Sequence, residues 1–73
     1  MGKDARIRFA KRLRELRKKK GWTQEKLAEC ADLSYRHVQR LENTKNPPPA
    51  KIDSIEKIAH AFKLTSSKLL DYQ

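Results

Sequence analysis

Cysteine, glycine, proline and aromatic residues are all scarce in this chain of 73 residues. Its single cysteine, Cys30, forms neither an internal disulfide nor a cysteine-rich zinc site. The sequence contains no stretch of about 18 apolar residues, so we expect no membrane-spanning helix. Residues 1–10 lack the apolar segment of a signal peptide, and we therefore expect a cytoplasmic protein.

The abundant residue types are Leu, Ile, Ala, Lys, Arg and Glu, which favour helices over sheets. Apolar residues are spread along the whole length, which argues against disorder throughout. The length allows one domain with a modest core. These features together predict a single all-α domain over residues 1–73.

The net charge of +9 and the pI near 10.1 are high for so small a chain. Such a field attracts polyanions, first among them nucleic acid and next an anionic membrane surface. A soluble basic domain that binds no polyanion would carry the same charge. Charge alone therefore leaves these three alternatives open.

Apolar residues at helical spacing predict five helices. We expect them at about residues 4–20, 23–32, 34–43, 51–62 and 65–71. Gly21 ends the first helix, and Thr23, Ser34 and Thr65 are suitable N-caps for later ones. Asp32 must turn the chain in a left-handed conformation, which aspartate tolerates better than most residues.

The helical pattern also predicts which side chains form the core. Trp22 is expected as a hydrophobic plug between the first two helices, while Leu69, Leu70 and Tyr72 suit either a core or an interface. The inward residues expected on the first four helices are Phe9, Leu13, Leu16, Leu27, Ala28, Ala31, Val38, Leu41, Ile52, Ile55, Ile58, Ala59 and Phe62.

Residues 24–43 carry the pattern that points to function, because they predict two short helices joined by a tight turn. The small side chain of Ala28 allows these helices to cross closely at a steep angle. With the apolar residues turned inward, one polar and basic face of the second of these helices stays free. An α-helix fits the major groove of DNA, where arginine bonds guanine edges and glutamine bonds adenine. The free face carries Tyr35, Arg36, His37, Gln39 and Arg40.

The segments FAKRLRELRKKKGWTQEKLAECADLSYRHVQRLEN and IEKIAHAFKLTSSKLL resemble the phage-repressor family, the lambda-repressor and Cro type of helix-turn-helix regulator. The resemblance runs from Phe9 to about Leu70, nearly the whole chain. It implies a compact five-helix domain that binds operator DNA. The sequence departs from the family in three places. Asp32 stands where a turn glycine is usual, Thr44 replaces a common glycine after the third helix, and the proline-containing loop at residues 44–50 is longer.

The resemblance implies roles for individual residues. Gln24 falls where the family places a glutamine that bonds a phosphate and steadies the first residue of the third helix, here Tyr35. Arg17 and Glu42 match a pair that forms a buried salt bridge between the first and third helices. The residues that we expect to contact DNA are Gln24, Ser34, Tyr35, Arg36, His37, Gln39, Arg40, Asn43, Lys45 and Asn46.

We expect His37 to face solvent or a phosphate and not a metal ion. The other histidine, His60, lies far along the chain, and neither has a cysteine at ligand spacing. We expect no metal and no cofactor. An enzyme is not favoured, because a phosphate loop, a metal set and a nucleophile–base pair are all lacking.

These patterns favour a small transcriptional regulator, a repressor or autoregulator, that binds a palindromic operator as a homodimer. Prophage repressors, restriction-modification controllers and antitoxins all fit this description. The main alternative is a protein-interaction module on the same fold, such as a coactivator or an antitoxin, whose third helix would be poor in base-reading side chains. Binding to duplex RNA is less favoured, because a helix cannot enter its deep and narrow major groove.

Overall fold

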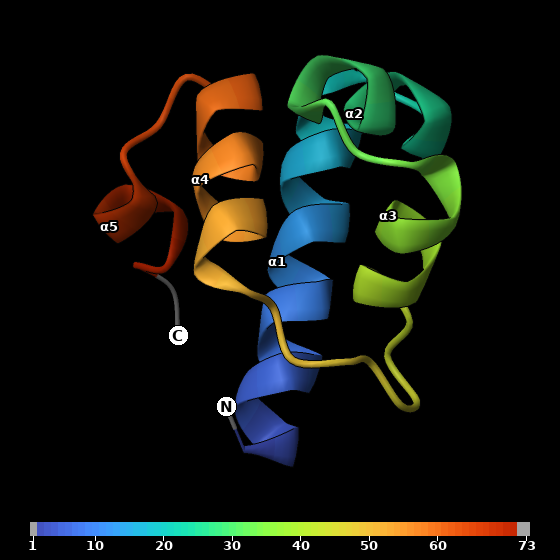
Figure 1. The fold of residues 1–73 in the computed structure, drawn as a ribbon, viewed down its shortest axis with the longest axis vertical. Helices are drawn as coiled ribbons and strands as arrows, with labels where there is room; N and C mark the ends of the chain where they lie inside the picture. Colours follow the sequence, from blue (N-terminus) through green and yellow to red (C-terminus); the bar gives the residue numbers. More distant parts are fainter. Residues whose placement is uncertain (1, 72–73) are drawn as a thin grey trace.

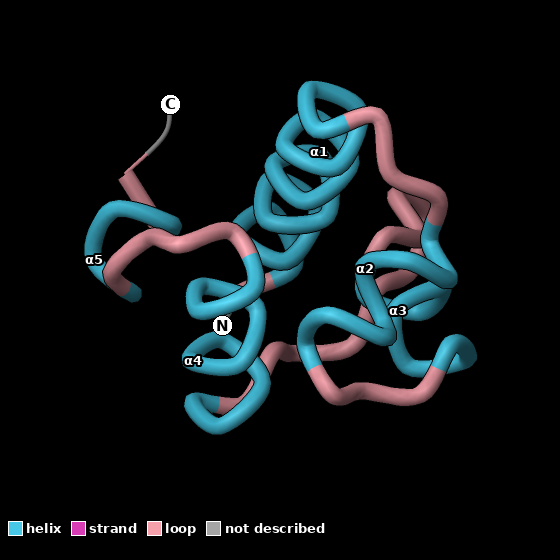
Figure 2. The backbone as a smooth tube through the Cα atoms, turned by 90° about the horizontal axis from the view of Figure 1, so that it is seen from above, coloured by secondary structure: helices cyan, strands magenta, loops and turns pink. Residues whose placement is uncertain are grey.

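A computed structural model describes residues 2–71 of the chain and contains five helices in that range (Figure 1). No strand occurs among these residues, as the tube in Figure 2 makes plain. The predicted all-α fold is therefore confirmed. Tyr72, which was predicted to suit either a core or an interface, lies outside the described residues. The helices are α1 (Lys3–Lys20), α2 (Gln24–Ala31), α3 (Tyr35–Leu41), α4 (Ile52–Ala61) and α5 (Ser66–Leu69).

The predicted helix ends follow from local chemistry. Gly21 ends α1 in the left-handed conformation with φ 70°, and its N–H donates to a carbonyl of the last turn. Thr23, Ser34 and Thr65 are the N-caps of α2, α3 and α5, and each side-chain oxygen accepts a hydrogen bond from the amide three residues ahead. Asp32 adopts the expected left-handed conformation, with φ 54°.

The third helix is shorter than predicted, because it ends at Leu41 and not near Asn43. Glu42 is its C-cap, and the Oδ1 atom of Asn43 accepts a hydrogen bond of 2.9 Å from the backbone N–H of Lys45. Asparagine side chains that bond the nearby backbone in this way compete with continued helix. This turn starts the loop that leads past the prolines to α4.

The core contains residues from all five helices. The buried apolar residues in contact are Phe9, Leu13, Leu27, Ala28, Ala31, Val38, Leu41, Ile58, Ala59, Phe62 and Leu69. The prediction was wrong for Ile52, whose exposed fraction is 75%. Ile52 is the first residue of α4, and the apolar residues of this helix that pack on the core begin with Ile55. Leu69 is buried, whereas Leu70 is 42% exposed.

Trp22 packs against the core from the segment between α1 and α2. Its ring stacks on that of Phe62 at the end of α4, with 5.3 Å between centroids and 15° between planes. The ammonium group of Lys20 lies 5.9 Å from the Trp22 ring. Trp22 therefore joins the start of α2 to α4. The prediction placed it only between the first two helices and did not include the contact with α4.

The helices are arranged so that α3 lies at one side of the domain and α5 at the other (Figures 1 and 2). The inner side of α3 packs on α2 and α1, while its outer side faces away from the rest of the chain. None of the helices within residues 2–71 is both long and apolar enough to cross a membrane.

Candidate nucleic-acid interface

The outer face of α3 gathers the polar side chains that the sequence predicted for base reading. Val38 and Leu41 are fully buried against α2 and α1, which fixes the rotation of the helix. Because residues three and four apart share a face of a helix, the remaining positions point outward together. The exposed residues of this face are Tyr35, Arg36, Gln39 and Arg40.

This face is positively charged and its cations are available to a ligand. Within residues 2–71, no ion pair engages Arg36, Arg40 or Lys45. The neighbouring acid, Glu42, is only 3% exposed and its charge is already matched by Arg17. An anion that approaches α3 therefore meets unpaired guanidinium and ammonium groups.

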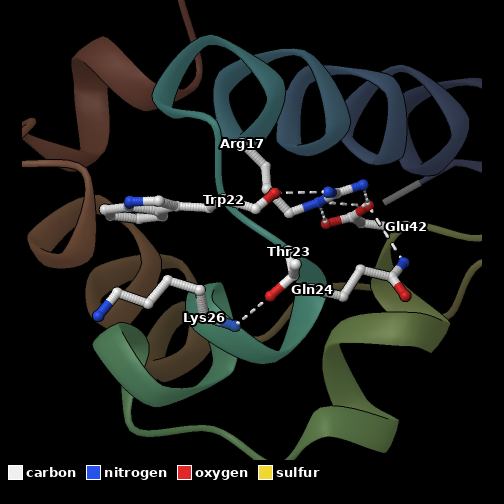
Figure 3. A network of polar contacts seen from close by, with 6 residues as sticks. All are labelled: Arg17, Trp22, Thr23, Gln24, Lys26 and Glu42. Atoms are coloured by element: carbon white, nitrogen blue, oxygen red, sulfur yellow. Dashed lines mark hydrogen bonds and ion pairs between the residues drawn. The ribbon is translucent and has the colours of Figure 1, made fainter.

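An ion pair joins the C-terminal end of α3 to α1 (Figure 3). The Arg17 Nε atom lies 2.9 Å from Oε2 of Glu42, and Nη2 donates to Oε1 at 3.0 Å. The remaining terminal nitrogen, Nη1, donates to the backbone carbonyl of Trp22 at 2.8 Å. The side chains of Arg17 and Glu42 are 14% and 1% exposed. A fork-to-fork contact of this kind sets direction as well as distance, so it holds α3 in a defined orientation on the domain.

Gln24 is the first residue of α2 and is half-buried. We expected its side chain to steady Tyr35, but its Nε2 atom donates to Oε1 of Glu42 at 3.3 Å (Figure 3). In this structure Gln24 therefore supports the end of α3 and not its first residue. A side-chain amide has two N–H donors and one acceptor, so this bond leaves further capacity for a phosphate.

His37 differs from the prediction that its side chain faces solvent or a phosphate. Its ring is half-buried, and Nε2 lies 3.1 Å from the hydroxyl oxygen of Ser54 on α4. Ser54 is itself buried, with 6% exposure. The pair thus connects the first turn of α3 to α4. Ser34, which we also expected at the DNA, caps α3 through a 3.1 Å bond from the His37 amide.

No three His, Cys, Asp or Glu side chains gather as a potential metal site in the described part of the chain. Cys30 is half-buried and free.

Beyond α3, the chain forms a pocket that the sequence did not reveal. Arg40, Asn43 and Asn46 line it, together with Arg6 of α1 and two prolines of the loop. Arg6 is not among the residues that the sequence predicted to contact DNA. Arg6 shares a helical row with Ala10, which is buried, and that row hints that Arg6 is not fully solvated, but the pocket itself depends on the path of the loop.

Comparisons with known proteins agree with this geometry. Residues 13–69 match the helix-turn-helix family model. The restriction-modification controller protein C.AhdI from Aeromonas hydrophila is similar in structure, with a TM-score of 0.78 and 33% sequence identity. The similarity covers 88% of this chain and 94% of C.AhdI. The curated protein sequences contain no significant match. The chain therefore belongs to the helix-turn-helix family of DNA-binding transcriptional regulators, of the phage-repressor type.

Proposed function

We propose that this protein binds a specific double-stranded DNA sequence with α3 in the major groove and thereby regulates transcription. One observation carries the proposal: α3 is fixed on its inner side, while its outer side presents exposed arginine, glutamine and tyrosine side chains that have no acidic partner among residues 2–71. A helix of this kind has the size and the donors that major-groove recognition requires.

The side chains divide into base-reading and backbone-binding groups. Arg36 and Arg40 are suited to guanine edges, and Gln39 is suited to adenine. Tyr35 can pack on a thymine methyl group or bond a phosphate. Phosphate contacts carry no sequence information but set the register of the protein on the duplex. The residues that we assign to the backbone are Gln24, Asn43, Lys45 and Asn46.

The regulatory role is supported by the similarity to C.AhdI, which is described as a restriction-modification controller protein. Among the systems that fit such a small regulator, this similarity favours a controller of restriction-modification genes. A single helix reads only a few base pairs, so we propose that two copies bind a palindromic operator, as a repressor or autoregulator.

The test is binding to duplex DNA followed by fluorescence anisotropy across a salt series. A sequence selected from a random duplex library, or the DNA upstream of the protein's own gene, is compared with a scrambled duplex. The wild type should prefer its site by at least about a thousandfold. The Arg36→Ala, Arg40→Ala double variant should lose this preference but retain salt-sensitive binding to both duplexes.

The matched control is an Arg8→Ala, Arg14→Ala double variant, which removes the same charge from exposed positions of α1. This control variant should bind both duplexes more weakly by the same factor, so the preference for the specific site should be unchanged. If selection enriches no sequence, or if the wild type binds both duplexes equally, the proposal of specific DNA recognition is wrong and a protein partner becomes the better hypothesis.

A further inference from the structure

The loop after α3 passes the N-terminal turns of α1 (Figure 1). A pocket is lined by residues of both segments. Three separate parts of the chain contribute side chains to it: α1, the end of α3, and the loop. The residues that line it are Arg6, Arg40, Asn43, Asn46, Pro47 and Pro48. It is therefore continuous with the proposed DNA-binding face, but it extends beyond the helix-turn-helix motif.

The chemistry of the lining suits an anion. Two guanidinium groups and two side-chain amides supply N–H donors, and no carboxylate is among the lining residues. Arg6 donates from Nη1 to the carbonyl of Pro47 at 3.5 Å, which is a long contact. Its Nε atom is buried and has no hydrogen-bond partner within the described residues. A buried charged donor without an acceptor is costly, and this cost is relieved when the side chain shifts so that Nε meets an acceptor, which a bound anion supplies.

We propose that this pocket binds one phosphate of the DNA backbone and that Arg6 donates to it directly. The inference rests on the proposed function, because it assigns a further contact to the same DNA complex. Guanidinium groups present parallel donors that match the oxygens of a phosphate.

A phosphate is favoured over a base edge because the pocket lies past the end of α3, beside Asn43, where the chain leaves the outer face of the helix. Backbone contacts of DNA-binding proteins flank the base-reading helix in this way. Pro47 and Pro48 form part of the wall, and the fixed φ of proline keeps the loop extended and stiff. The loop backbone that carries Asn46 is consequently restricted before DNA arrives, which reduces the entropy lost on binding.

The experiment combines Arg6→Gln with single methylphosphonate substitutions that neutralise each operator phosphate in turn. Arg8→Gln is the control, because Arg8 is an exposed arginine on the same helix. At one position in each half-site, the methylphosphonate should weaken DNA binding by the wild type and by the Arg8→Gln variant by about tenfold. At the same position it should weaken binding by the Arg6→Gln variant by less than about twofold. If the loss of binding free energy caused by Arg6→Gln adds to the loss caused by the methylphosphonate at every position, the proposal is wrong.

A second readout uses the salt dependence of binding to a scrambled duplex, which needs no operator. Loss of one phosphate contact should reduce the slope of log K against log salt by about 0.9 per bound chain for Arg6→Gln, and by much less for Arg8→Gln. An unchanged slope for Arg6→Gln refutes phosphate binding by the pocket, whether or not the wild type prefers a particular sequence. Absence of sequence preference in the wild type refutes the proposed function and leaves this test of the pocket intact. Should Arg6→Gln fail to fold, Arg6→Lys keeps the charge but loses the Nε donor, and the methylphosphonate comparison is made with that variant.

Discussion

Arg17 donates to both carboxylate oxygens of Glu42, across 25 residues of sequence, and so ties α1 to the C-terminal end of α3. The same guanidinium group holds the carbonyl of Trp22. One buried cluster therefore fixes three segments: the first helix, the turn into α2, and the end of α3. The orientation of the DNA-binding face depends on this cluster, although none of its charges is available to DNA.

Replacement of Glu42 by Gln should destabilise the domain strongly. The substitution keeps the shape of the side chain but leaves the largely buried charge of Arg17 without its counter-ion. Breaking one partner of a buried pair costs about 3 kcal/mol or more. Urea unfolding followed by circular dichroism measures the loss. The control is Glu29→Gln, which breaks the exposed pair with Lys26 and should change stability by less than about 1 kcal/mol. If Glu42→Gln unfolds at the same urea concentration as the wild type, the ion pair is not needed for the fold.

The bond between His37 and Ser54 should stabilise α3 on the domain without contributing to DNA affinity. His37→Ala and Ser54→Ala should each cost about 1 kcal/mol of unfolding free energy, the usual net value of one hydrogen bond. A double-mutant cycle should then show that the two losses are not additive, because both remove the same interaction.

DNA binding by the same two variants tests the role of the histidine. Operator affinity should stay within about twofold of wild type for both, as expected for two partners of one intramolecular bond. A large loss for His37→Ala alone would mean that the ring leaves Ser54 and contacts DNA in the complex.

Lys63 should tolerate glycine with a gain in stability. It follows α4 in the left-handed conformation with φ 58°, which costs a residue with a Cβ atom about 1 kcal/mol relative to glycine. We therefore expect Lys63→Gly to raise the midpoint of thermal unfolding by several degrees for a domain of this size. Lys63→Ala is the control, because it removes the exposed side chain but keeps the Cβ atom, and it should give no gain. Equal midpoints for the two variants would rule out relief of backbone strain.

The sequence was sufficient for the features that depend on neighbouring residues. The caps at Thr23, Ser34 and Thr65, the glycine end of α1 and the left-handed turn at Asp32 all involve bonds within a few residues. The periodic apolar residues gave the order of the helices for the same reason.

Features that depend on long-range packing were missed. The exposure of Ile52 is decided by where α4 begins relative to the core, and the His37–Ser54 bond joins two helices whose contact no spacing rule predicts. The position of Arg6 in the pocket requires the path of the loop across α1, because Pro47 lies 41 residues further along the chain. The left-handed conformation at Lys63 carries no sequence signal, since lysine rarely adopts it.

Two copies of the protein should occupy one operator, and the spacing of its half-sites should be set by the DNA helix. Two α3 helices that enter successive major grooves on one side of the duplex lie about 34 Å apart, which corresponds to one helical turn or about 10 base pairs. Sedimentation of the complex at saturating protein should therefore give two chains per duplex. Insertion of about 5 base pairs between half-sites should place them on opposite sides of the DNA and weaken binding sharply, whereas substitution of the same central base pairs at unchanged length should have a smaller effect. A single chain per operator, or an affinity that does not respond to spacing, would contradict the dimer, and the specificity of one α3 would then have to suffice alone.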